Sequence, residues 1–140
     1  MKTKIISKIL LSLALVFVLG SAITQVHGEQ EKLPVITIHS TGDVTRGKTG
    51  SFVLKMDPVM FGGMYVNFSV SGTAVPGVDY VPLVSPAYIG QTGYGVILVK
   101  TLPGPRASAV RQSYGVVVTL ESGPGYAVGQ PSLAKMMINP

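Results

Sequence analysis

Short stretches in which apolar and polar residues alternate constrain the fold of this chain more than any other feature. The clearest is Met64–Ser71 (MYVNFSVS), where Met64, Val66, Phe68 and Val70 fall on one face. Successive side chains of a β-strand point to opposite faces, so this spacing predicts a strand with one buried face. Glycine- and proline-rich turns separate such stretches, and no segment after residue 28 has a convincing helical period.

About seven segments of this kind follow one another along the chain. They are Val35–Ser40, Ser51–Met56, Met64–Ser71, a weak strand that ends in PAYIG (86–90), Gly93–Leu102, Ser113–Glu121 and Ser132–Ile138. The other expected inward rows are Ile36 and Ile38; Phe52, Leu54 and Met56; Tyr94, Val96 and Leu98; and Tyr114, Val116, Val118 and Leu120. Short strands at this turn spacing are typical of an all-β sandwich of two packed sheets.

The first 28 residues have the pattern of a secretory signal peptide. Three lysines precede an apolar stretch, Ile9–Leu19, and small residues follow it. The pattern predicts cleavage after Gly28, or alternatively after Ala22, and a chain that is secreted, periplasmic or at the cell surface. Eleven apolar residues are few for a membrane span of about 20. An uncleaved segment that tethers the chain to a membrane is the alternative.

The predicted organisation is therefore a signal peptide (1–28), a flexible lead-in (29–34) and one β-sandwich domain (35–140). Without the three lysines before residue 9, eight Lys and Arg oppose six Asp and Glu, which leaves a net charge of +2. These cations are scattered rather than clustered, which argues against a nucleic acid as partner. The chain has no cysteine, so packing rather than disulfides must stabilise it.

Four stretches carry a resemblance to a known family. They are SGTAVPGVDY (71–80), IGQTGYGVILV (89–99), YGVVVTL (114–120) and GPGYAVGQPSLAKMMI (123–138). In this order they resemble the Calx-β domain over about Pro34–Pro140. The resemblance implies an immunoglobulin-like Greek-key β-sandwich.

The resemblance also implies where calcium ligands would lie. In family members that bind calcium, they are the Asp of the Asp-Tyr pair (here Asp79), an acidic run between the fifth and sixth strands, and acids beyond the last strand. Here the connection 103–112 carries Arg106 and Arg111 and no acid, and only Asn139 and Pro140 follow Ile138. Calcium needs about 6–8 oxygen ligands. Asp43, in the connection after the first expected strand, is one possible further carboxylate ligand.

We therefore expect a degenerate calcium site and no cofactor, with Asp79 and Asp43 as the ligands if Ca²⁺ binds after all. An ion pair of Asp79 with Arg106 or Arg111 is the expected replacement. The stretch around Asp79 also has a structural explanation. Gly72 and Ala74 allow a close backbone approach, Pro76-Gly77 fits a tight turn, and Asp79 can accept from nearby N–H groups.

No constellation of residues indicates an enzyme. After the signal peptide His39 is the single histidine, cysteine is absent, and no nucleophile, phosphate-binding or dinucleotide-binding motif occurs. The sequence predicts that His39 is an ordinary exposed side chain. Met56, Met60 and Met64 recur every four residues, but a proline and a Gly-Gly turn lie between them, so we expect them to fill the core and a loop.

Two surfaces are candidates for binding. If Tyr94, Val96 and Leu98 face the core, an aliphatic stripe remains outside, formed by Val35, Val53, Ile97 and Val99. A contiguous apolar patch marks a partner, such as a protein, an envelope component or a second copy. The second candidate is the basic connection from Arg106 to Arg111.

The sequence thus predicts a non-enzymatic structural or binding module of the cell envelope that acts through protein–protein contact. A calcium-binding adhesive module and a membrane-tethered accessory protein are the alternatives.

Overall fold

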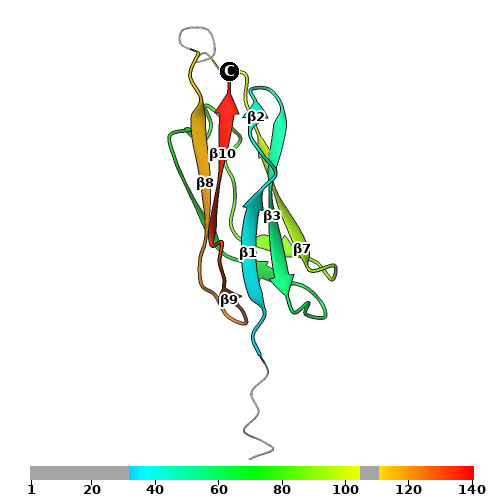
Figure 1. Ribbon diagram of the computed structural model, residues 1–140. Helices are drawn as coiled ribbons and strands as arrows, with labels where there is room; N and C mark the ends of the chain where they lie inside the picture. The colour runs from blue at the N-terminus through cyan, green and yellow to red at the C-terminus, as the bar shows by residue number, and fades with distance from the viewer. Residues whose placement is uncertain (1–31, 105–110) are drawn as a thin grey trace, which may run out of the picture. The chain divides into compact units, whose positions relative to one another are not determined.

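The computed structural model describes residues 32–104 and 111–140, in which Leu33–Pro140 form one compact unit (Figure 1). These residues form ten strands and no helix. The strands are β1 (Val35–Ser40), β2 (Val44–Thr45), β3 (Thr49–Asp57), β4 (Met64–Val66), β5 (Phe68–Ser71), β6 (Ala87–Ile89), β7 (Tyr94–Lys100), β8 (Tyr114–Leu120), β9 (Ala127–Val128) and β10 (Leu133–Asn139). No helix able to cross a bilayer occurs in the described ranges.

Two four-stranded sheets form the sandwich. The first sheet has the order β7-β3-β1-β9 and the second the order β2-β10-β8-β5, while β4 and β6 pair separately. In Figure 1, β8 and β10 lie on one side and β1, β3 and β7 on the other. The chain passes from β3 in the first sheet to β5 in the second, back to β7, and again to β8. These crossings are Greek-key connections, and the fold is the all-β, immunoglobulin-like sandwich that was expected.

Each of the seven expected segments contains a strand. The difference in number arises because Met64–Ser71 is split in two and because β2 and β9 are strands of two residues each. β2 pairs in parallel with β10, and β9 pairs in parallel with β1. Such short pairings carry no periodic signal, so alternation alone could not reveal them.

The split of the third segment lies at Asn67. β4 pairs with β6, whereas β5 pairs with β8 in the second sheet. The Asn67 N–H donates to the Tyr126 hydroxyl (3.0 Å), and its carbonyl accepts from the Glu121 N–H (2.9 Å). The backbone of Asn67 is therefore satisfied outside β4 and β6, and the strand changes partners without losing its alternation.

The core lies between the two sheets and contains most of the expected rows. Ile36, Ile38, Phe52, Leu54, Met56, Val66, Phe68, Val116, Val118 and Leu120 are all buried. Met64, Val70 and Tyr114 are partly buried and pack against this core. Burial of apolar area at roughly 25 cal/mol per Å² stabilises such a cysteine-free sandwich.

The expected orientation of β7 is wrong. Ile97 and Val99 are buried, with 6% and 0% of their surfaces exposed, whereas Val96 and Leu98 are 54% and 63% exposed. Lys100 falls on the same face as Val96 and Leu98, and keeping its charge in water places Ile97 and Val99 in the core. On the buried face, a Cβ at Gly95 would lie 2.5 Å from the Tyr88 carbonyl oxygen, so only glycine fits beneath β6.

The exit of β5 confirms the structural explanation of its glycine. Gly72 has a φ of +114°, and a Cβ there would lie 2.2 Å from the carbonyl oxygen of Gly115. The neighbouring Ala74 N–H donates to that same carbonyl (2.9 Å), and the Gly115 N–H donates to Thr73 Oγ1 (2.8 Å). Gly72 thus lets the backbone after β5 stay against β8 and carries the chain toward Asp79.

Candidate functional site

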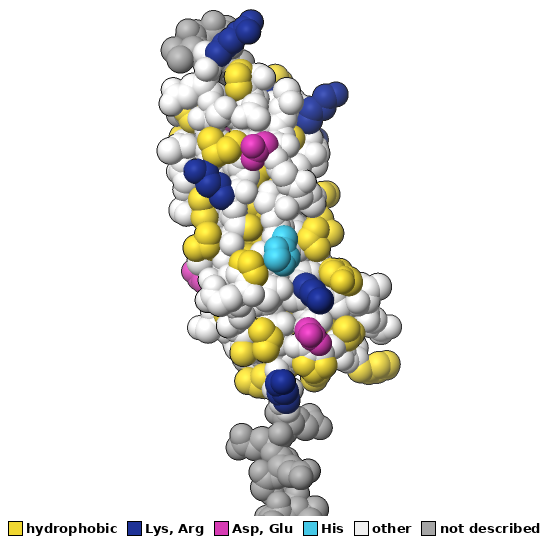
Figure 2. All heavy atoms as spheres, viewed as in Figure 1, with side chains coloured by type: hydrophobic (Ala, Val, Ile, Leu, Met, Phe, Trp, Pro, Cys, Tyr) yellow, Lys and Arg dark blue, Asp and Glu magenta, His cyan; other side chains and the backbone are white. Residues whose placement is uncertain are grey.

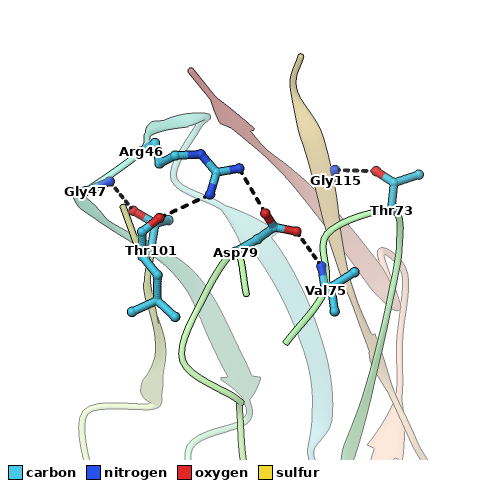
Figure 3. Close-up of polar contacts among 8 residues, drawn as sticks. Arg46, Gly47, Thr73, Val75, Asp79, Thr101 and Gly115 are labelled. Carbon is cyan, nitrogen blue, oxygen red and sulfur yellow. Dashed lines mark hydrogen bonds and ion pairs between the residues drawn. The ribbon is translucent and has the colours of Figure 1, made fainter. Parts of the chain in front are cut away.

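Asp79 is the fully buried centre of a polar network at one end of the sandwich. Its Oδ2 accepts from the Val75 N–H (2.7 Å), and its Oδ1 accepts from Nη2 of Arg46 (2.9 Å) (Figure 3). The Asp79 N–H donates back to the Val75 carbonyl (2.8 Å). The carboxylate thus closes the turn that follows β5, as the sequence suggested, and also meets a cation.

Arg46 reaches this position from the turn between β2 and β3. Its Nη1 donates to the Leu102 carbonyl (3.1 Å), and its guanidinium carbon lies 5.8 Å from the centre of the Tyr114 ring. Only 5% of its side chain is exposed. A guanidinium between a carboxylate, a carbonyl and an aromatic face is well satisfied in this buried setting.

The ion pair that the structure shows for Asp79 is with Arg46, which was not among the expected partners. Arg111 is exposed, and Arg106 lies outside the described residues. The Arg46 guanidinium meets Oδ1 of Asp79, the residue that we named as a ligand in case Ca²⁺ binds. The alternation after Val44 is a signal that could have identified it. Val44 is buried and Thr45 exposed, so Arg46 falls on the inward side.

Asp43, the second candidate ligand, is exposed and binds the backbone of β10. Its Oδ1 accepts from the Met137 N–H of β10 (2.9 Å). Within residues 32–104 and 111–140, no three His, Asp or Glu side chains gather in a way that could hold a metal ion. Asp79 and Asp43 each accept from a backbone N–H group, and Asp79 also pairs with the Arg46 guanidinium.

Tyr80 follows Asp79 and is almost fully buried. Burial raises the pKa of its hydroxyl above the ordinary value, and the nearby Asp79 carboxylate raises that pKa further. Both effects disfavour the phenolate, because a second negative charge would be buried beside the first. The site therefore holds Tyr80 in its neutral form.

The second site is the outer face of the first sheet. Tyr94, Val96 and Leu98 of β7, which we call the β7 row, each expose more than half of their surface. Val53 pairs with Val96 in the register of β3 and β7 and is half-buried. Figure 2 shows hydrophobic side chains beside the cyan histidine, on the side where β3 and β7 lie in Figure 1.

The expected stripe of Val35, Val53, Ile97 and Val99 therefore needs correction. Ile97 and Val99 belong to the core, while Val35 and Val53 lie half-buried on the outer face as expected. His39 is exposed on the same face, where it pairs in register with Val53. An apolar surface exists on this sheet, but the residues of β7 that form it are shifted by one position.

A groove borders the β7 row. It has a volume of about 360 Å³ and lies between β7 and the segment that leads into β6. Leu83, Val84 and Pro86 line it on one side and Val96 and Leu98 on the other. Val84 is one of the most exposed aliphatic residues in the described part of the chain. The β7 row thus borders a groove whose lining side chains are mostly apolar.

The three methionines have the roles expected of them. Met56 is buried in β3, and Met60 and Met64 are partly buried and pack against the core. They lie on no helix.

No family model matches the chain, and no curated protein matches it. A similar solved structure is the crystal structure of a two-domain protein of unknown function from Bacteroides fragilis. The sequences are 14% identical, the TM-score is 0.43, and the match covers 79% of this chain and 43% of that chain. The chain thus spans less than half the length of that protein. Its own strand order defines its class, an immunoglobulin-like β-sandwich.

Proposed function

We propose that this chain is an exported, non-enzymatic binding module of the Calx-β type that contacts a protein through the outer face of its first sheet. The observation that carries the proposal is the exposed β7 row. Tyr94, Val96 and Leu98 belong to a strand whose other face fills the core, so their exposure is not a defect of packing.

The chemistry of this face favours a protein partner. Contiguous exposed apolar surface on a soluble domain marks an interaction site, whereas single apolar side chains do not. The β7 row continues through Val53 on the sheet and through Val84 across the groove. Aromatic and aliphatic side chains in one patch are the usual centre of a protein interface.

The resemblance to Calx-β domains and the pattern of residues 1–28 support the remaining parts of the proposal. Residues 1–28 lie outside the described residues. Mass spectrometry of the native chain tests export: we expect it to begin at Glu29, or at Ile23. A native chain that still begins at Met1 would favour the membrane-tethered alternative.

A photo-crosslinking amino acid at position 98 tests the binding face. We expect it to capture one discrete partner in the envelope fraction of the source cells. The matched control places the same amino acid at Leu133, which is also a leucine with more than half of its surface exposed but lies on β10 of the other sheet. Equal capture from both positions, or no capture from position 98, would contradict the proposal.

A further inference from the structure

Backbone hydrogen bonds show which residues of β7 face its neighbour β3. Just before β7, the Gly93 carbonyl accepts from the Met56 N–H (2.8 Å). Just after it, the Thr101 N–H donates to the Lys48 carbonyl (3.2 Å). In an antiparallel pair, bonded and non-bonded positions alternate. The odd-numbered residues of β7 therefore bond to β3, and Val96 and Leu98 direct their N–H and C=O groups away from it.

The edge that these groups form is open in its middle. At one end of this edge the Lys100 carbonyl accepts from the Val81 N–H (2.9 Å), and at the other end the Tyr94 carbonyl accepts from the Gly90 N–H (3.3 Å). Between them, Val96 and Leu98 have no backbone partner among the described residues. Two donors and two acceptors thus lie side by side on an exposed strand edge.

The segment beyond this edge cannot fill it. Pro82 and Pro86 have no N–H and cannot donate to β7. Between them, Ser85 Oγ accepts from the Phe68 N–H of β5 (3.0 Å), which holds this segment toward the second sheet. The place of one strand is therefore empty beside β7, and it coincides with the groove.

We propose that this edge receives an extended segment of another protein as an added strand. The segment has an apolar run that pairs with Val96 and Leu98, and a carboxylate that meets Lys100. This inference rests on the proposed function, because it assigns the partner of the same face. Main-chain hydrogen bonds then supply affinity, and side chains that enter the groove supply specificity.

The groove explains the apolar run. Side chains of an added strand would alternate between the outer face, beside Val96 and Leu98, and the groove, above the buried Ile97 and Phe68. Apolar side chains suit both positions, because those in the groove meet apolar lining residues and those on the outer face lie beside the exposed Val96 and Leu98. A lipid or small apolar molecule would leave the backbone groups of Val96 and Leu98 unpaired.

Charge favours a separate acidic segment over a second copy. Lys100 ends β7, Lys55 pairs in register with Tyr94, and neither forms an ion pair with a described residue. If β7 paired with itself so that Val96 met Leu98, Lys100 of one copy would lie opposite Tyr94 of the other and near its Lys55. That arrangement gathers cations, whereas a segment with a glutamate complements them.

Amide hydrogen exchange with synthetic peptides tests the inference. The probes are two capped heptapeptides with a Val-Ile-Val-Ile-Val centre and a glutamate at the first or the last position. We expect one of them to bind and to slow exchange at the Val96 and Leu98 amides by about tenfold or more. Exchange at Ile97 and Val99, whose amides already bond to β3, should stay unchanged.

Two controls separate edge pairing from docking on the face. N-methylation of the peptide amides that face β7 should abolish binding, whereas N-methylation of the alternate amides should not. Leu98→Pro, which removes one N–H of the open edge, should weaken binding, and Val53→Thr should not. If Leu98→Pro fails to fold, the methylated peptides still decide the matter.

Three outcomes would overturn the inference. Equal binding of the methylated peptides, with shifts at Val53, would show docking on the face and leave the proposed function intact. Protection of Val96 and Leu98 without peptide, rising with protein concentration, would show pairing between copies. Failure of both peptides to bind at millimolar concentration would reject the added strand, while crosslinking from position 98 would still test the proposed function separately.

Discussion

Arg46 joins segments that are far apart in the sequence. Its guanidinium donates to Asp79 and to the Leu102 carbonyl, and its N–H donates to the Asn139 carbonyl at the end of β10 (2.8 Å). Asp79 is fully buried, and a buried carboxylate that loses its cation costs several kcal/mol. The structural role of this pair therefore depends on both partners.

We expect Arg46→Met to lower the free energy of unfolding by about 3–5 kcal/mol, because it leaves the Asp79 charge buried without this partner. Urea denaturation followed by tyrosine fluorescence measures the change. The matched control is Arg111→Met, which alters an exposed arginine and should change the free energy by less than about 0.5 kcal/mol. Equal small losses in both variants would show that Arg46 does not stabilise Asp79.

Gly72 and Gly77 allow a second comparison at this scale. Both have positive φ values, but a Cβ at Gly72 meets the Gly115 carbonyl, whereas one at Gly77 meets nothing within 4 Å. Gly77→Ala should cost about 1–2 kcal/mol from backbone strain alone. Gly72→Ala should cost clearly more, because strain and a collision with β8 add together. Equal losses in thermal or urea unfolding would contradict the close approach.

Tyr80 should lower the free energy of unfolding at alkaline pH. Its pKa in the folded chain is raised, so the unfolded chain loses this proton first as the pH rises past about 10. The stability that the neutral hydroxyl contributes is complete below that pH and is lost as the pH rises to the folded pKa. We expect Tyr80→Phe to reduce the fall in unfolding free energy above pH 10. An unchanged pH profile would contradict this.

Among the elements, strands with clear polar and apolar rows were predictable and β7 was not. Polar residues mark the outer rows of β1 and β3, such as Thr37, His39 and Lys55, so their inner faces could be assigned. The sequence VILV in β7 is apolar on both faces, and alternation cannot distinguish them. The informative residue was Lys100, which shares a face with Leu98.

Lysine substitutions on adjacent residues of β7 test its orientation. We expect Val99→Lys to destabilise the fold by about 4 kcal/mol or more, because it buries an unpaired charge. Leu98→Lys places the same charge in water and should change stability by less than about 1 kcal/mol. Chemical denaturation of the two variants gives the comparison. A larger loss for Leu98→Lys would restore the orientation expected from the sequence.

For the whole molecule, the sandwich was predictable because it follows from many local patterns, whereas the polar site was not. Asp79 could be singled out, but its partner comes from a turn 33 residues earlier. The alternation after Val44 places Arg46 on the inward side, but which buried carboxylate an inward arginine reaches depends on how the two sheets pack. The same limit applies to the groove, which two prolines and a serine create together.

Melting temperatures measured with and without Ca²⁺ test whether the intact chain binds calcium. A ligand that binds the folded state raises the melting temperature, and Asp79 already pairs with Arg46. We expect the same melting temperature in millimolar Ca²⁺ as in EDTA, with Mg²⁺ as the matched ionic control. A rise of several degrees that is specific to Ca²⁺ would favour the calcium-binding adhesive module.

The position of β10 has a consequence for the order of assembly. β10 lies between β2 and β8 in the second sheet, and its Asn139 carbonyl accepts from Arg46. The ribosome makes β10 after every other strand of that sheet, so the sheet cannot close before synthesis reaches it. Distant pairings of this kind form slowly. Until β10 has been made, β2 and β8 have no strand between them, so the second sheet of a nascent chain stays incomplete.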